Sequence, residues 1–97
     1  MALSLILHDL SALEPDDEKR FFEAIFQIAP EHWRVSDGAT LVDTGVSPLY
    51  LREHLVRALP DERRSGTQLL VTRLSADSSW NALPKEGEAW LKNALMP

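Results

Sequence analysis

Prolines divide the 97-residue sequence into segments and limit what each segment can fold into. A proline breaks a helix that reaches it from the preceding residues, yet it suits the first turn of a new helix. Pro15 and Pro30 therefore enclose one predicted helix, which we expect Asp16 or Asp17 to cap. Its apolar residues recur at helical spacing and predict an aromatic core face: Phe21, Phe22, Ile25, Phe26, Ile28 and Ala29.

Two further helices are predicted at later prolines. Ser47 comes directly before Pro48, and this pair is typical of an N-cap followed by proline at the first helical position. The helix should run from about residue 48 to 59, with an apolar stripe of Leu51, Leu55, Ala58 and Leu59. From Pro84 onward a last helix is predicted, because one helical face collects Trp90, Leu91, Ala94 and Leu95.

The segments between the helices have the short apolar runs of β-strands. Residues 3–8 are too few for a helix and are bounded by turn-forming residues, so they predict a buried strand. The run "TQLLVTRLS", residues 67–75, has leucines and β-branched residues on both faces. This pattern predicts a central strand, covered by helices on one side and by a partner on the other.

The stretch "HWRVSDGATLVDTG" predicts a hairpin. Two β-prone runs, residues 32–36 and 39–45, flank Asp37 and Gly38. Because Asp-Gly readily takes the positive φ angles of a type I′ turn, we expect the two runs to pair antiparallel around that turn.

The predicted order is β-α-β-β-α-β with an added C-terminal helix, in a single domain over residues 1–97. Right-handed crossovers then place two helices on one face of a four-stranded antiparallel sheet, an α+β ferredoxin-like arrangement. The 44% hydrophobic and 26% charged content is that of a chain that folds unaided. Since the first two helices leave one sheet face uncovered, we expect a homodimer.

Composition excludes several classes of protein. The chain has no cysteine, so it has neither a disulfide nor a thiolate metal site, which fits a cytoplasmic location. The N-terminal apolar run is broken at His8 and Asp9, too early for a signal peptide or a membrane span. We therefore expect a cytoplasmic protein without a membrane partner.

The charge pattern disfavours a general nucleic-acid binder. The formal net charge is -5, whereas nucleic-acid partners normally need a positive binding face. Four arginines are concentrated in one stretch of the sequence: Arg52, Arg57, Arg63 and Arg64. Because acidic residues lie among them, they predict a solvated face of mixed charge.

Three stretches resemble one family. They are "LILHDLS" near the start, "HWRVSDGATLVDTGVSPLYLREHL" in the middle and "W…LPKEGEAWL" in the tail. With them the chain resembles the small SinR-like proteins, which are related to the second CRISPR-associated protein family, whose members are endoribonuclease-like. The resemblance implies a dimer with one of two roles. One is a metal-dependent nuclease using Mg²⁺ or Mn²⁺ on nucleic acid, and the other is a scaffold without catalysis.

The resemblance carries one site residue over to this chain. The family's characteristic aspartate closes the first strand in a Tyr-Asp dipeptide, and Asp9 occupies that position here as the implied catalytic residue and metal ligand. His8 stands where the tyrosine would be, and Leu10 and Ser11 follow where a second acidic residue often stands. The extra C-terminal helix is a third departure, since related members end in a strand exchanged between protomers.

The residues themselves allow two interpretations of Asp9. Two symmetry-related carboxylates could hold one Mg²⁺, but an aspartate after a strand ordinarily caps a backbone turn. His8 points to the opposite face from Asp9, so the two cannot form a simple dyad, and we interpret His8 as structural. Trp80 and Trp90 are interpreted as a clamp that holds the last helix to the sheet. No glycine pattern or catalytic triad is visible, so no cofactor-binding residue is predicted.

Overall fold

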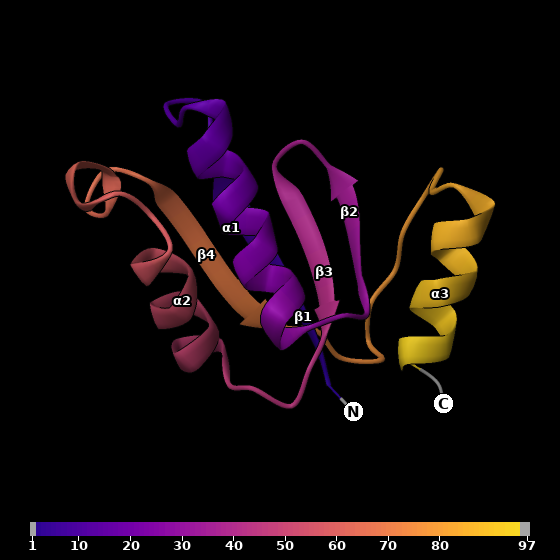
Figure 1. Cartoon of the computed structure of the whole chain (residues 1–97). Coiled ribbons are helices and arrows are strands. Elements are labelled where there is room, and N and C mark those ends of the chain that lie inside the picture. The colour runs from indigo at the N-terminus through magenta and orange to yellow at the C-terminus, as the bar shows by residue number, and fades with distance from the viewer. Residues whose placement is uncertain (1, 96–97) are drawn as a thin grey trace.

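The protein is an α+β structure with one four-stranded antiparallel sheet, seen in a computed structural model that describes residues 2–95 (Figure 1). The strands are β1 (Leu3–Asp9), β2 (His32–Ser36), β3 (Ala39–Asp43) and β4 (Gln68–Arg73). The helices are α1 (Pro15–Ile28), α2 (Pro48–Arg57) and α3 (Lys85–Leu95), with a 3₁₀ turn at Asp61–Arg63. The α+β class and the order of helices and strands along the chain agree with the sequence prediction.

The strand order across the sheet is β2-β3-β1-β4, and all neighbours are antiparallel. The prediction that the 67–75 run forms a central strand is wrong, because β4 lies at an edge and β1 occupies the position between β3 and β4. The apolar residues on the two faces of β4 have different surroundings. Leu69 and Val71 pack into the core, whereas Leu70 points to the other side and is 56% exposed.

The helix starts follow their prolines. At α2 the prediction is confirmed, since the Ser47 hydroxyl oxygen accepts a hydrogen bond from the Tyr50 N–H at 3.1 Å. At α1 the predicted cap is wrong. The helix already begins at Pro15, so Asp16 and Asp17 lie inside its first turn, where carboxylates favourably face the helix dipole.

The hairpin forms between β2 and β3, but its turn is not type I′. Neither Asp37 nor Gly38 has a positive φ angle, and the pairing shifts register between Arg34 and Ser36. A bulge therefore adapts the strands to the turn. The absence of a side chain at Gly38 lets the hairpin turn lie close to β1, because a Cβ there would lie 3.3 Å from the His8 carbonyl oxygen.

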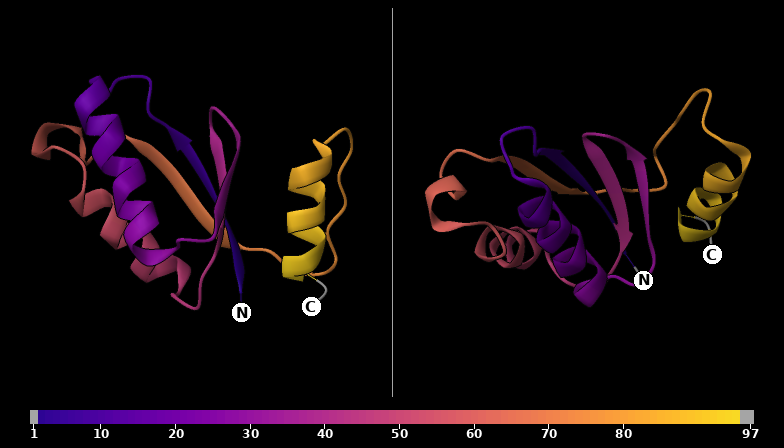
Figure 2. Two further views of the ribbon diagram at one scale, coloured as in Figure 1. Left: turned by 45° about the vertical axis from the view of Figure 1, so that its right-hand side comes forward. Right: turned by 45° about the horizontal axis from the view of Figure 1, so that its top comes forward.

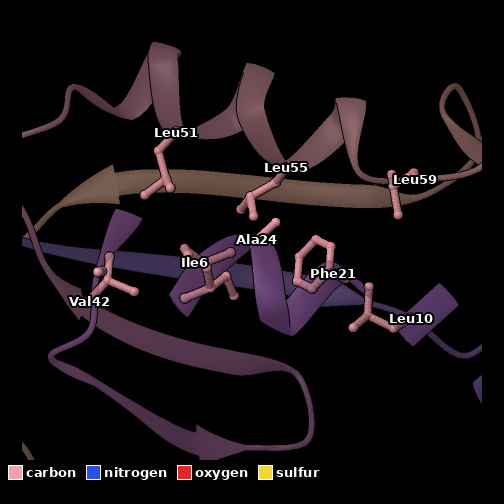
Figure 3. Close-up of a cluster of buried hydrophobic side chains, with 10 residues drawn as sticks. Ile6, Leu10, Phe21, Ala24, Val42, Leu51, Leu55 and Leu59 are labelled. Atoms are coloured by element: carbon pink, nitrogen blue, oxygen red, sulfur yellow. The ribbon is translucent and has the colours of Figure 1, made fainter. Parts of the chain in front are cut away.

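The main core lies between the sheet and the pair α1 and α2, on what we call the helix face (Figure 3). Its fully buried side chains include Ile6, Phe21, Ile25, Val42, Leu51, Leu55 and Leu59. Phe26 was expected in this core but is 60% exposed. The buried residues of α1 are Phe21, Ala24 and Ile25, so the buried side of the helix is the one that carries these three residues and not Phe26.

A second cluster lies on the opposite sheet face, which we call the second face. Leu3 and Leu41 pack there against Leu91 of α3, and Trp80 and Trp90 pack around them while remaining partly exposed. Figure 2 shows α3 on the β2 side of the sheet, well apart from α1 and α2. None of the helices within residues 2–95 is long and apolar enough to cross a membrane.

Candidate functional site

The end of β1 places His8 and Asp9 on opposite faces of the sheet. His8 lies on the helix face and is 5% exposed, whereas Asp9 is exposed on the second face. Asp9 pairs in register with Gln68 of β4. Strand alternation, read from the sequence, thus correctly separates the two side chains.

The Asp9 carboxylate is held in a turn. Its Oδ1 accepts hydrogen bonds from the Ser11 hydroxyl at 2.7 Å and from the Ser11 N–H at 3.1 Å. The hydroxyl bond and, to a smaller extent, the backbone bond lower the pKa of Asp9 below its ordinary value. The side chain is therefore ionised at neutral pH and caps the turn in the way ordinary for an aspartate after a strand. Because both bonds go to Oδ1, Oδ2 is the oxygen better placed to ligate a cation.

Two surface hollows meet at Asp9. One, of about 220 Å³, lies against Leu7, Gln68 and Leu70. The other, of about 430 Å³, extends to the charged side chains of Glu18, Arg34 and Asp37. A ligand in either hollow would contact the Asp9 region.

Arg34 is engaged within the protein. Its Nη2 lies 3.6 Å from Glu18 Oε1 and donates to the Asp37 carbonyl at 3.2 Å. Its guanidinium also lies 4.4 Å from the centre of the Phe22 ring. The positive charge nearest the larger hollow is thus already partly balanced.

His8 is enclosed by aromatic rings. It contacts Phe21 and Phe22 edge-to-face, at 5.6 Å between ring centroids, and its Nε2 lies 3.0 Å from Thr40 Oγ1. Nδ1 is buried and has no hydrogen-bond partner among residues 2–95. Burial, followed by the charge of Arg34, lowers the pKa of His8, so the ring is neutral at pH 7. This environment supports the structural interpretation of His8.

No metal centre is formed within residues 2–95 of one chain, where no three His, Cys, Asp or Glu side chains gather to hold an ion. His32 Nδ1 instead lies within hydrogen-bond distance of the carbonyl of Ala29, directly after α1, and His54 Nε2 within that distance of the carbonyl of Ala24 in α1. A cation at Asp9 would need further ligands from a second copy, from nucleic acid or from water.

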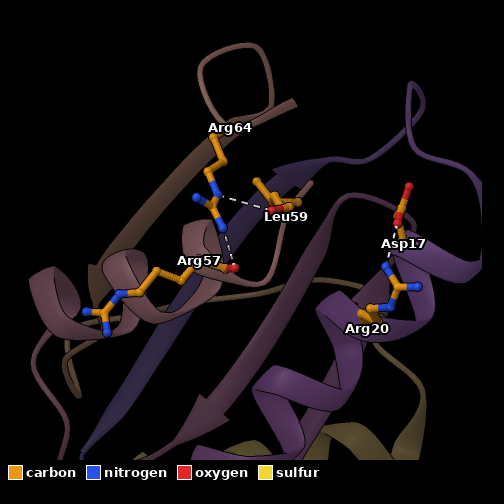
Figure 4. Close-up of polar contacts among 5 residues, drawn as sticks. All are labelled: Asp17, Arg20, Arg57, Leu59 and Arg64. Carbon is orange, nitrogen blue, oxygen red and sulfur yellow. Dashed lines mark hydrogen bonds and ion pairs between the residues drawn. The ribbon is translucent and has the colours of Figure 1, made fainter. Parts of the chain in front are cut away.

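The arginines of the α2 region lie among acidic side chains: Arg52 and Arg57 both contact Glu53, at 3.9 and 3.8 Å. Arg64 donates to the carbonyls of Leu59 and Arg57 and pairs with Asp61 at 2.8 Å. Figure 4 shows these backbone contacts and the nearby pair of Arg20 with Asp17. Arg64 thereby satisfies carbonyls at the end of α2 that lack helical partners.

Sequence reasoning missed two features of the sheet. Arg73 donates to the Ser4 hydroxyl and to the carbonyls of Thr44 and Val46, joining β4 to the connection after β3. Leu7 and Leu70 are direct cross-strand neighbours that both remain exposed, at 41% and 56%. The alternation within β4 signalled an outward Leu70, but only the pairing with β1 places Leu7 beside it.

No family model matches this sequence, and no curated protein matches it either. The geometry around Asp9 and the surface of the sheet are therefore the features that bear on function.

Proposed function

We propose that this protein is a homodimeric interaction module, a scaffold of the SinR-like kind with a ferredoxin-like fold. The β-α-β-β-α-β order and the antiparallel strand order β2-β3-β1-β4 support the ferredoxin-like part of the proposal. The core that joins β1 and β3 to both α1 and α2 supports it further.

The exposed pair of Leu7 and Leu70 carries the proposal. The second face is covered near β2 and β3 by the cluster around Leu91, while this pair lies uncovered on the β1–β4 half. Burying the exposed part of Leu70 would stabilise an assembly by on the order of 1 kcal/mol for each copy. A protein whose role is to join others has a use for such a surface, and a second copy is the partner that we propose.

The environment of Asp9 suits this role. Its carboxylate already caps the turn at Ser11, so a structural task explains the residue. The net charge of -5 also disfavours contact with phosphates over a wide surface.

A second candidate is a metal-dependent nuclease in which Asp9 binds Mg²⁺ or Mn²⁺. One observation favours it: Asp9 is exposed beside two hollows, and its lowered pKa keeps it ionised. Two Asp9 side chains brought together across a dimer axis could hold an ion whose bound water attacks a phosphodiester.

Cleavage and light scattering together test the two candidates. Purified protein is incubated with single-stranded RNA and with duplex DNA, with Mg²⁺, with Mn²⁺ and with a chelator. The scaffold proposal expects a dimer at micromolar concentration and no metal-dependent cleavage.

Two variants make the result decisive. Asp9→Asn removes the charge, and Ser11→Ala removes one hydrogen bond while keeping the carboxylate. If wild type and Ser11→Ala cleave only with metal, and Asp9→Asn does not cleave although it remains folded, the nuclease candidate replaces the scaffold. A wild type that stays monomeric contradicts the dimer.

A further inference from the structure

The two edges of the sheet differ in how they are protected. An edge strand presents unpaired backbone N–H and C=O groups, and proteins commonly block such edges with prolines, bulges or lysines. The β2 edge has a register shift between Arg34 and Ser36. The β4 edge pairs with β1 in unbroken register from Gln68 to Arg73, and it contains no proline, lysine or acidic residue.

We infer that β4 pairs antiparallel with β4 of a second copy, with Leu70 facing the partner's Leu70 across the two-fold axis. This inference rests on the proposed dimer and names its interface. The unpaired backbone groups of each β4 would then be satisfied by the other, which extends the two sheets into one.

The sequence of β4 is self-complementary in this register. Directly opposed residues of antiparallel strands point to the same face, so Leu69 meets the partner's Val71 and Gln68 meets the partner's Thr72. On the second face, Leu70 packs beside the partner's Leu70 at the axis, while Leu7 lies one strand further in and stays on the open face. A shift by one residue would place apolar side chains opposite residues of the other face.

The charge of the strand also favours a second copy as the occupant. Residues 68–72 contain no charged side chain, so nothing in this stretch would attract a basic or an acidic partner. An identical strand supplies leucine against leucine and a polar side chain against a polar one. Such like pairing is what a two-fold interface requires.

In this register the two Asp9 side chains of the dimer lie far apart. Asp9 lies beside Gln68, two residues along the strand from the axis and one strand inward. With strands about 4.8 Å apart and a rise of about 3.4 Å per residue, the two Asp9 positions are roughly 20 Å apart. They could not ligate one ion together, so edge pairing supports the scaffold over the nuclease.

Engineered cysteines test the register, and the absence of natural cysteine removes any background. Leu70→Cys should form a disulfide-linked dimer under mild oxidation, because opposed Cβ atoms lie about 4.5–5.5 Å apart. Gln68→Cys alone should not crosslink, since its twin is offset by four residues, roughly 14 Å. The double variant Gln68→Cys with Thr72→Cys should crosslink, since the two positions oppose each other.

A matched pair of lysine variants tests the interface without crosslinking. Leu70→Lys places two charges opposite each other and should raise the dimer dissociation constant at least about ten-fold in light scattering. Leu49→Lys changes a leucine of similar exposure, 60%, on α2 and should leave the constant unchanged. Because dimerisation itself raises the urea midpoint, far-UV circular dichroism spectra that match the wild-type spectrum would show that both variants remain folded.

The outcomes separate this inference from the proposed function. Crosslinking of Leu70→Cys together with dissociation of Leu70→Lys supports edge pairing. A wild-type dimer in which Leu70→Cys fails to crosslink, or in which Gln68→Cys crosslinks equally well, overturns edge pairing and leaves the dimer standing. A monomeric wild type overturns both.

Discussion

Gly87 of α3 lies directly against the indole ring of Trp33 in β2. A Cβ atom built at position 87 would collide with the six-membered part of that ring. Gly87 is one of the two buried residues of α3, together with Leu91. The missing side chain is thus what lets α3 approach the sheet closely.

Replacing Gly87 by alanine should therefore destabilise the docking of α3. In an exposed helix interior this change stabilises by about 1 kcal/mol, but here overpacking should cost roughly 1–3 kcal/mol. Urea unfolding followed by tryptophan fluorescence measures the change. Gly45→Ala is the control, because a Cβ at Gly45 meets nothing within 4 Å. A midpoint for Gly87→Ala equal to or above that of wild type would refute the close contact.

The hydrogen bonds between Asp9 and Ser11 should be detectable in the titration of Asp9. Ser11→Ala should raise the pKa of Asp9 toward its ordinary value, because the Ser11 hydroxyl bond is the largest cause of its lowering. Carboxyl NMR shifts followed against pH measure this pKa, with exposed Ser65→Ala as the control. An unchanged Asp9 titration in Ser11→Ala would show that the hydroxyl bond is absent in solution.

The same turn predicts how stability depends on acid. Since the pKa of Asp9 is lower in the folded state, its contribution is complete above the unfolded pKa and is lost as pH falls through the folded value. Urea midpoints measured from about pH 6 down to about pH 2.5 should fall less steeply for Asp9→Asn than for wild type. Parallel curves would contradict the linkage.

The buried His8 should make the stability of the protein depend on pH over a different range. Because burial lowers its pKa, the unfolded chain takes up a proton at this residue before the folded chain does. Stability should be full above the unfolded pKa near 6.5 and should fall as pH drops below it. His8→Gln should flatten this loss between about pH 7.5 and pH 5. A wild-type slope in His8→Gln would assign the dependence to another group.

Removing the hydrogen bonds of Arg73 should weaken the attachment of β4 and lower the stability of the protein. Arg73→Met removes donors to Ser4, Thr44 and Val46 and should lower the free energy of unfolding by about 1–2 kcal/mol. Arg52→Met is the control. Within the described part of the chain, the ion pair of Arg52 is a 3.9 Å contact with Glu53, so Arg52→Met should change the free energy of unfolding by no more than about 0.5 kcal/mol. Equal urea midpoints for the two variants would contradict the role given to Arg73.

The sequence by itself determined the features that depend on neighbouring residues. Ser47 and Pro48 start α2 because capping needs only the first turn of the helix. His8 and Asp9 point to opposite faces because strand alternation is a property of the backbone. The turn at Asp9, one of the two interpretations of that residue, likewise needs only Ser11.

Tertiary structure alone decided the features that depend on distant partners. β4 is an edge strand because β1 pairs with both β3 and β4, which no local pattern in residues 67–75 reveals. Phe26 stays exposed because the buried side of α1 carries Phe21 and Ile25 and not Phe26. Gly87 is required only because Trp33, far away in sequence, packs against it. Interactions between neighbouring residues thus determine where helices and strands begin. Which apolar side chains stay exposed depends on how the helices pack on the sheet, because the packed surface has room for only some of them.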